Sequence, residues 1–345
     1  MQNRIAMLGL SCVIALLFFA PVSKPEIRNI SEPCGVVLLC AMPPRKVAWE
    51  DGHKESLQQA CCFILTHKAG FTLIEMSIVL IIIGLIVGGI LVGQDLIQGA
   101  TVRAQISQIQ KYQAAVHTFQ TKYNNYLPGD MPDPDATQFG FQSRGIYPGE
   151  GDGNGVIEGV YQDAANSNWG GFESAGETVV FWVDLSAAGL IDGTFNTGTE
   201  TNRSTIASAN LGKYFPTAKI GQGNYIYVFS GGPGISSPGT NYYSLSAVTS
   251  VPYGSGPYSN LALSVQQANA IDGKLDDGLP QSGNIMAVYL NYSNSMWVGA
   301  ASGAVANGSS STCYDNGGNA SNPMRYSLGQ NSGTGLNCAL SFQFQ

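Results

Sequence analysis

The sequence predicts an α+β fold, in which one long N-terminal helix packs on a C-terminal, antiparallel β-rich globular domain. Two observations support this fold class. The chain has no proline from residue 71 to residue 126, and residues 76–93 carry no charge, which favours one long helix. Further on, runs of alternating aromatic and β-branched residues stand between Gly, Pro and Asn, a pattern typical of strands and turns. We expect four parts, with boundaries 1–70, 71–93, 94–126 and 127–345.

Composition excludes several classes of function for the part after residue 70. It holds nine basic and 18 acidic residues, a formal net charge of −9, which argues against nucleic-acid binding. Glycine and aromatic residues are both plentiful, as in a secreted, loop-rich β domain and unlike a disordered chain. His117 is the only histidine there, so the predicted globular part lacks the base of a Ser/His/Asp or Cys/His site. We therefore expect no enzyme.

The uncharged run is long enough to cross a bilayer, which takes ~20 residues. Glu75 lies inside the first turns of this apolar segment. A lone carboxylate in lipid costs ~2.5–3.5 kcal/mol or more, so we expect Glu75 to have a function. His67 and Lys68 precede the run, which places that end in the cytoplasm by the positive-inside rule.

The stretch Gly70-Phe71-Thr72-Leu73-Ile74-Glu75 resembles the processing site of type IV pilins and type II secretion pseudopilins. The resemblance implies that a prepilin peptidase cuts after Gly70, that Phe71 is then N-methylated, and that Glu75 pairs with the N-terminal amine of a neighbouring subunit. It also implies a pilin-like fold and a single pass through the inner membrane, with the C-terminal domain in the periplasm. The expected partners are other pilin or pseudopilin subunits, the peptidase, the inner membrane and an assembly platform. After assembly the chain would lie in a cell-surface or periplasmic filament.

Residues 1–70 would then be a leader that is removed. Residues 5–20 look like the core of a signal peptide, whereas leaders in the pilin family are short and basic. Our hypothesis is that much of 1–63 is not part of the natural product and that translation starts at Leu65. The competing interpretation is a true secretory signal at 5–20.

Beyond the apolar part, the helix should continue as an amphipathic helix. Apolar residues at three- and four-residue steps form a stripe that we expect to pack on the chain's own domain: Leu96, Val102, Ile106, Ile109, Tyr112, Val116, Phe119 and Tyr123. The glutamines 105, 108 and 110 lie off this stripe. The spacings Gly84/Gly88 and Gly89/Gly93 either let helices approach closely or soften the helix. Many relatives have a proline near the position of Val92, and this chain has none.

Breaker residues at 124–130 end the helix, and a connector follows to residue 171. A second helix is expected within 172–190. The candidate strands are 224–230, 242–249, 260–265, 285–290 and 295–300, with a short helix at 264–271 as the alternative to the third.

Five of the seven cysteines precede the expected cut site, which leaves Cys313 and Cys338. An even pair in an oxidising compartment predicts a disulfide. Two unrelated free thiols are the alternative.

The only cofactor that the sequence points to is Ca²⁺. Residues 151–159, GDGNGVIEG, place oxygen ligands on Asp152, Asn154 and Glu158, in the alternation that calcium loops use. The match to an EF-hand is partial, and a plain turn explains it equally well. Asp272, Asp276 and Asp277 form a second acidic cluster. Pseudopilins often bind Ca²⁺ in such loops, but Lys274 could instead neutralise a surface turn.

These observations predict a structural subunit of a type IV pilus or type II secretion pseudopilus. A minor subunit is favoured, because the 275 residues after Gly70 exceed the length of a typical major pilin. The alternative is a membrane-anchored periplasmic binding module, adhesin-like or substrate-binding, that does not polymerise. The missing histidine argues against a third option, a tethered hydrolase.

Overall fold

The computed structural model describes residues 72–147, 149–160, 172–201, 204–231, 239–291, 295–299, 311–319 and 321–345. These residues belong to the second of two units, Met1–Ala69 and Gly70–Gln345, into which the chain divides. The predicted leader, the start at Leu65, and the cut site at Gly70 and Phe71 lie outside the described residues.

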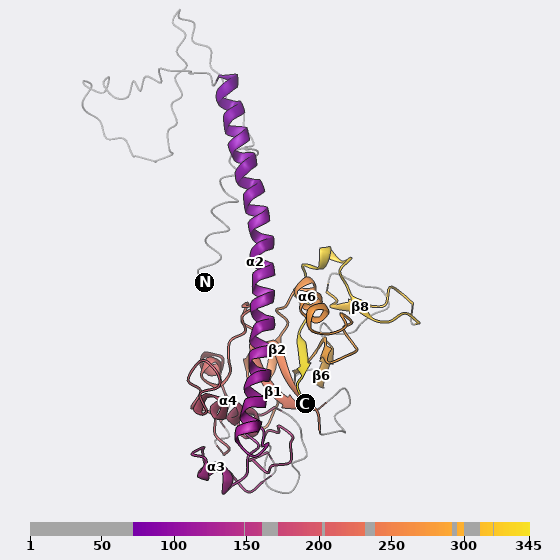
Figure 1. The fold of residues 1–345 in the computed structure, drawn as a ribbon. Coiled ribbons are helices and arrows are strands. Elements are labelled where there is room, and N and C mark those ends of the chain that lie inside the picture. Colours follow the sequence, from indigo (N-terminus) through magenta and orange to yellow (C-terminus); the bar gives the residue numbers. More distant parts are fainter. Residues whose placement is uncertain are drawn as a thin grey trace, which may run out of the picture. The chain divides into compact units, whose positions relative to one another are not determined.

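Helix α2, Leu73–Lys122, spans 50 residues without interruption (Figure 1). Thr72 caps its N-terminus: the Thr72 hydroxyl accepts the amide of Glu75, and the Glu75 carboxylate accepts the amide of Thr72. The helix ends where Asn124 and Asn125 adopt positive φ angles, which asparagine tolerates better than most residues. The helix therefore ends just before the breaker residues 124–130 that were predicted to end it.

The first half of α2 is exposed and the second half is packed. Large apolar side chains from Leu73 to Ile97 stand exposed, Leu80 to 68% and Leu91 to 60%. From Val102 onward one face is buried, as the stripe predicted: Val102, Ile109, Tyr112, Val116, Phe119 and Tyr123. Leu96 belongs to the exposed half, at 70%, so the stripe begins later than expected.

Two glutamines were placed wrongly by the sequence pattern. Gln105 and Gln108, expected off the packed face, are buried. Gln105 Oε1 accepts the amide of Ile220 at 3.0 Å, and Gln108 Oε1 accepts the amide of Lys219 at 2.9 Å. Gln108 Nε2 also donates to the Thr217 carbonyl. They face the domain because a loop there presents backbone groups that need partners.

A five-stranded antiparallel sheet forms the centre of the domain. Its strands are β1 (Tyr225–Ser230), β2 (Asn241–Ser250), β3 (Tyr258–Asn260), β4 (Ile285–Met286) and β9 (Leu340–Gln343). Their order is β1-β2-β9-β4, and β3 pairs with the other end of β2. The predicted strands 224–230 and 242–249 match β1 and β2. Strand β9 pairs on both sides and was not predicted.

Two short hairpins complete the β structure among the described residues. Strands β5 (Val288–Asn291) and β6 (Ser295–Gly299) form one, and β7 (Tyr314–Asp315) and β8 (Arg325–Tyr326) form the other. The predicted strand 285–290 is thus divided between β4 and β5. The predicted strand 260–265 is wrong: β3 ends at Asn260, and helix α6 (Val265–Leu275) follows. Ser264 and Gln267 form a capping box that starts this helix, so the helical alternative holds.

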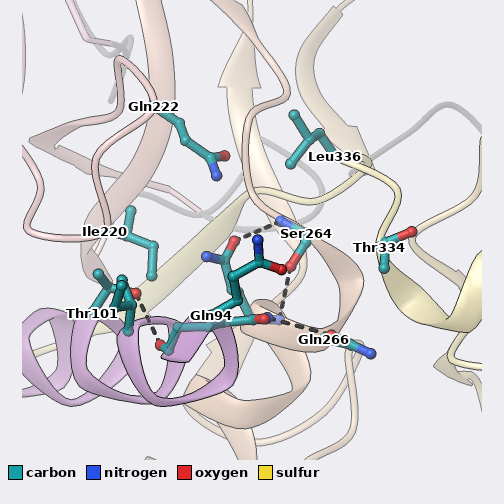
Figure 2. A pocket seen from close by; sticks show the side chains of 11 residues that line it. Gln94, Thr101, Ile220, Gln222, Ser264, Gln266, Thr334 and Leu336 are labelled. Atoms are coloured by element: carbon teal, nitrogen blue, oxygen red, sulfur yellow. Dashed lines mark hydrogen bonds between the residues drawn. The ribbon is translucent and has the colours of Figure 1, made fainter. Parts of the chain in front are cut away.

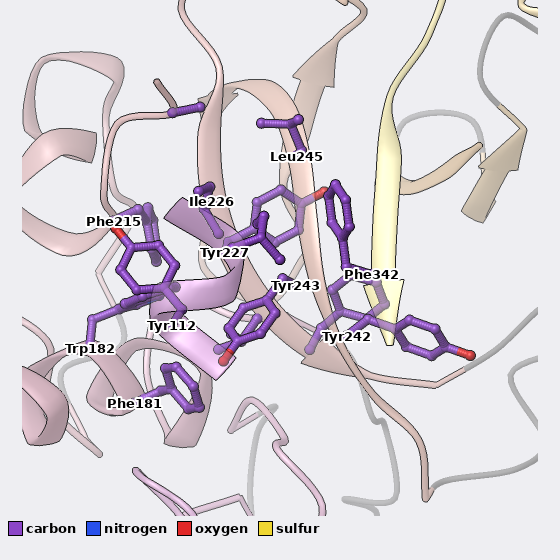
Figure 3. Close-up of a cluster of buried hydrophobic side chains, with 14 of the residues drawn as sticks. Tyr112, Phe181, Trp182, Phe215, Ile226, Tyr227, Tyr242, Tyr243, Leu245 and Phe342 are labelled. Atoms are coloured by element: carbon purple, nitrogen blue, oxygen red, sulfur yellow. The ribbon is translucent and has the colours of Figure 1, made fainter. Parts of the chain in front are cut away.

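Helix α4 (Glu177–Ala187) lies within the predicted range 172–190 and is buried along most of its length. The shorter helices are α3 (Asp135–Gln138), η1 (Ser208–Asn210), α5 (Leu211–Tyr214) and η2 (Asn331–Gly333). Figure 3 shows the aromatic core where Tyr112 of α2, Trp182 of α4 and Tyr243 of β2 meet. Tyr112 and Trp182 pack edge to face at 5.1 Å. The second half of α2 is therefore part of the domain core.

Cys313 and Cys338 form the predicted disulfide, and both are buried. Ser327 N donates to the Cys313 carbonyl, and Cys338 pairs with Leu263 in an isolated bridge. The bond fastens the β7–β8 hairpin to the segment that enters β9. The two cysteines are 25 residues apart in the sequence. Closing a loop of this length stabilises the folded chain by ~3 kcal/mol in the chain-entropy model.

Candidate functional site

The apolar start of α2 is the first candidate site. Among the described residues, α2 is the one helix that is long and apolar enough to cross a membrane, and no part of its most apolar window is buried in the domain. The glycines at 84, 88, 89 and 93 have no neighbouring atom within 4 Å of an added Cβ. This surface is open to lipid or to another helix.

Glu75 is the only ionisable residue in residues 72–94. Its Oε2 accepts hydrogen bonds from the Thr72 amide and the Thr72 hydroxyl, both at 2.8 Å. In the single chain the carboxylate thus caps its own helix, which satisfies donors that a helix start leaves free.

A second candidate is a carboxylate cluster on the domain, formed by Asp130, Asp152 and Glu177. Each offers an oxygen, and these oxygens lie within 4.8 Å of one another. Asp130 comes from the connector after α2, Asp152 from the glycine loop, and Glu177 from the first turn of α4. The glycine loop folds around Asp130, whose carboxylate accepts the amides of residues 153, 154 and 155.

Burial governs the protonation of this cluster. Desolvation raises the pKa of Asp130 to about 7, and the charge of Asp152 adds to the rise. Desolvation and the charge of Asp130 also raise the pKa of Glu177 far above its usual range. Two buried carboxylates this close repel each other, so the folded chain must hold a proton or a cation between them.

The structure brings only part of the predicted ligand set of the glycine loop together. Asp152 joins the cluster, but Asn154 does not: its Oδ1 accepts the Val156 amide and its Nδ2 donates to Asp152. Glu158 is buried, and its amide donates to Glu177 Oε2 at 2.8 Å. The sequence pattern missed Asp130 and Glu177, because both lie far from the loop in the chain.

The second predicted cluster, Asp272, Asp276 and Asp277, is also brought together. Here each carboxylate already has protein partners. Asp272 accepts the Tyr326 hydroxyl and the Gly278 amide, Asp276 accepts the amides of Asn284 and Ile285, and Asp277 accepts the Leu279 amide and the Ser282 hydroxyl. These bonds close the turn between α6 and β4.

A buried ion-pair triad supports the connector. Arg144 Nη2 donates to Asp184 at 2.6 Å, and Arg144 Nη1 donates to Glu200 at 3.2 Å. Asp184 also accepts the amide of Gly129, the residue before Asp130. An added Cβ at Gly129 would lie 2.7 Å from the Glu177 carbonyl oxygen, so the chain needs glycine for this close approach. The triad thereby fixes Asp130 beside α4.

A pocket of about 380 Å³ lies where α2 leaves the domain. Figure 2 shows Gln94 and Thr101 of α2 opposite Ser264, the N-cap residue of α6, and Gln266 of α6. Gln98 Nε2 donates to Gln266 Oε1 at 3.3 Å. The pocket is lined by amides and hydroxyls together with the apolar side chains of Ile97, Ile220 and Leu336, and no charged group lines it, so its chemistry does not select a particular ligand.

Comparison with known proteins gave a match only around the start of the long helix. Residues 65–91 match the family model of the prokaryotic N-terminal methylation motif. Comparisons with curated proteins and with solved structures gave no match. The matched segment contains the predicted cut site, Glu75 and most of the exposed apolar half of α2. The chain therefore carries, at the start of its long helix, the N-terminal methylation motif that marks type IV pilins and pseudopilins.

Proposed function

We propose that the chain is a structural subunit of a type IV pilus or a type II secretion pseudopilus, processed after Gly70 and assembled through α2. One observation carries the proposal: the segment that matches the methylation motif is also the segment whose apolar side chains the domain leaves exposed. Apolar surface in water costs ~25 cal/mol per Å². The segment therefore needs lipid before assembly and neighbouring helices after it.

Glu75 supplies the specificity that apolar packing lacks. Apolar helices can slide past one another with little change in energy, whereas a carboxylate in an apolar environment is stabilised only beside a positive partner. Cleavage after Gly70 would create such a partner, the amine of Phe71. We infer that the Glu75 carboxylate binds this amine on a neighbouring subunit and thus fixes the axial position of each helix.

The size of the domain supports a minor subunit, and the motif supports a structural role over a catalytic one. The 275 residues after Gly70 place a large domain on each helix. A subunit of this size fits a filament in which it is rare, or one with wide spacing between domains. The assembly proteins that are present with the chain decide whether it enters a pilus or a pseudopilus.

The test is incorporation into filaments. Wild type and Glu75→Val would be expressed with their prepilin peptidase and assembly proteins, and filaments would be sheared and assayed by immunoblot and immunogold electron microscopy. Loss of a charged hydrogen bond removes about 1.5–3 kcal/mol, so incorporation should fall about tenfold or more. The level of membrane-anchored chain should be unchanged.

Two variants control this experiment. Thr72→Val removes the hydroxyl that caps α2 with Glu75 but keeps the carboxylate, so it should still incorporate. Asp95→Val removes an exposed carboxylate beyond the apolar segment and should also incorporate. Unchanged incorporation of Glu75→Val would contradict the pairing. A wild-type chain that stays anchored and never enters filaments would favour the binding module instead.

A further inference from the structure

The charges on α2 lie on either side of a stretch that matches the thickness of a bilayer. Residues 76–94 carry no charge and stand between Glu75 and Asp95. These 19 residues span ~29 Å at the rise of an α-helix, and the hydrocarbon core of a bilayer is ~30 Å thick. Because a charge inside the core is costly, both carboxylates lie at its edges when α2 crosses a membrane.

The pocket where α2 leaves the domain begins at the end of this stretch. The α2 residues that line it run from Gln94 to Thr101, a rise of ~10 Å. The headgroup layer of a bilayer extends ~5–8 Å beyond the hydrocarbon core on each side. When α2 is anchored, the pocket therefore lies at the height of the phospholipid headgroups.

Exposed apolar side chains lie at the same height. Leu96 and Ile97 of α2 are 70% and 66% exposed, and Leu336 of the domain is 49% exposed. Ile97 and Leu336 both line the pocket, and Ile97 ends the run of exposed apolar side chains that starts at Leu73. Apolar surface in contact with water is unfavourable, so the lipid that covers the first half of α2 would also cover these side chains.

The polar part of the pocket supplies hydrogen-bonding groups that the chain itself does not use. Figure 2 shows Gln222 across the pocket from Gln94 of α2. Both side chains are exposed. Each amide offers two N–H donors and one carbonyl acceptor. The donors suit the oxygens of a phosphodiester, and the carbonyls can accept a hydrogen bond from the ammonium or hydroxyl group of a headgroup.

We propose that this pocket binds the phosphodiester headgroup of a phospholipid, in the leaflet on the domain's side, so that the domain rests on the membrane before assembly. The inference depends on the proposed anchoring of α2 in a membrane. The height of the pocket on α2 identifies the ligand, which the lining alone does not. The volume of about 380 Å³ lies within the range of small-molecule sites, ~300–1,000 Å³.

The absence of charge in the lining fits a contact with the bilayer. The part after Gly70 has a formal net charge of −9, and an acidic domain is repelled by an anionic surface. A pocket that no charged group lines can hold a headgroup without selecting for its net charge. Phosphatidylcholine, which is zwitterionic, and phosphatidylglycerol, which is anionic, should therefore bind about equally well.

The experiment maps which positions of the full chain touch lipid. A photo-crosslinking amino acid replaces one residue at a time, the chain is reconstituted in phosphatidylcholine bilayers without assembly proteins, and lipid adducts are identified by mass spectrometry. We expect adducts at Gln222 and Leu336. We expect none at Gln110, which is exposed on α2 but lies ~24 Å beyond Gln94 along the helix.

Val87, in the exposed apolar part of α2, separates failure of this inference from failure of the proposed function. Lipid adducts at Val87 without any at Gln222 and Leu336 would overturn the headgroup contact and leave the anchoring intact. A chain without adducts at Val87 would not have α2 in the bilayer, which contradicts the proposed function and with it this inference.

A double variant, Gln94→Leu with Gln222→Leu, distinguishes a bound headgroup from mere proximity to the bilayer. The affinity for the most tightly held phospholipid is measured by native mass spectrometry of the full chain in detergent. Loss of amide hydrogen bonds to a charged phosphate should weaken this affinity about tenfold or more, whereas Gln110→Leu should bind like the wild type. Equal affinity of the double variant and the wild type, or binding of phosphatidylglycerol alone, would overturn the proposal.

Discussion

Glu173 is a buried carboxylate outside both acidic clusters. It is 7% exposed, and its Oε2 has no hydrogen-bond partner. Burial raises the pKa of Glu173 to about 8, although the amides of Ser174 and Gly254 lower it in part. At neutral pH the folded chain therefore tends to keep a proton that the unfolded chain releases.

The sign of the resulting pH dependence follows from this raised pKa. Between the unfolded value of 4.5 and the folded value of about 8, the folded state binds more protons than the unfolded state. Its stability therefore falls as the pH rises through this window. The glutamine side chain of Glu173→Gln is neutral at all pH values, so we expect the free energy of unfolding of this variant to fall less over the window. The difference in free energy of unfolding between the variant and the wild type should change by an amount on the order of a few kcal/mol.

Denaturant titrations at several pH values in this window, with chelator present, measure the gap. Asp192→Asn is the control: that carboxylate is exposed, and Lys111 lowers its pKa, so its loss should leave the slope above pH 5 unchanged. Parallel curves for the wild type and Glu173→Gln would show that Glu173 ionises freely in the folded chain.

At the residue scale, the sequence predicted functional residues only where they are close together in the chain. Glu75 and the residues around it form a continuous motif, and Asp152 and Glu158 lie in one loop. Asp130 and Glu177 were missed because only the folded backbone, with Gly129 against α4, brings them to Asp152. Asn154 lies outside the cluster, because its side chain forms hydrogen bonds within its own loop.

Two buried glutamines attach the long helix to the domain. Gln105 and Gln108 accept the amides of Ile220 and Lys219, and no strand pairs with those amides. Elsewhere α2 contacts the domain mainly through apolar packing, apart from a hydrogen bond from Gln98 to Gln266 and an ion pair of Lys111 with the exposed Asp192. Apolar packing fixes burial better than it fixes rotation or sliding, so the two buried amide contacts help to set the rotation and height of the helix on the domain.

Replacing Gln108 should show this contribution. Gln108→Ala leaves the Lys219 amide and the Thr217 carbonyl without their partner, and a buried polar group left unpaired costs about 1–3 kcal/mol. We expect the free energy of unfolding to fall by that amount in urea titrations. Gln110→Ala, two residues further along α2 and exposed, should change the free energy of unfolding by less than about 0.5 kcal/mol. Equal effects of the two variants would contradict a positioning role for Gln108.

At the element scale, the sequence predicted what local patterns determine. The long helix, α4, β1 and β2 follow from periodicity and from clear breakers. Strand β9 escaped prediction because its residues, LSFQ, are few and follow a glycine- and serine-rich tail. It is a strand because β2 and β4 offer open edges on both sides. The strand expected at 260–265 failed because the capping box of Ser264 and Gln267 starts a helix there.

At the scale of the whole molecule, the chain joins two parts that need different surroundings. The first half of α2 exposes apolar side chains along about two dozen residues, whereas the domain after it has a closed core and polar loops. Exposed apolar side chains are stable in lipid or among other helices, and the methylation motif over residues 65–91 fits an anchor in the membrane.

The proposed assembly through α2 requires processing that makes Phe71 the first residue of the chain. The direct measurement is mass spectrometry of the N-terminal peptide, from the protein purified out of cells that contain its prepilin peptidase. We predict a peptide that begins at Phe71 and carries one added methyl group on the α-amine, and an unprocessed chain when Gly70 is replaced by a bulky residue. A purified protein that still carries residues before Gly70, in cells whose peptidase processes other substrates, would contradict the central claim.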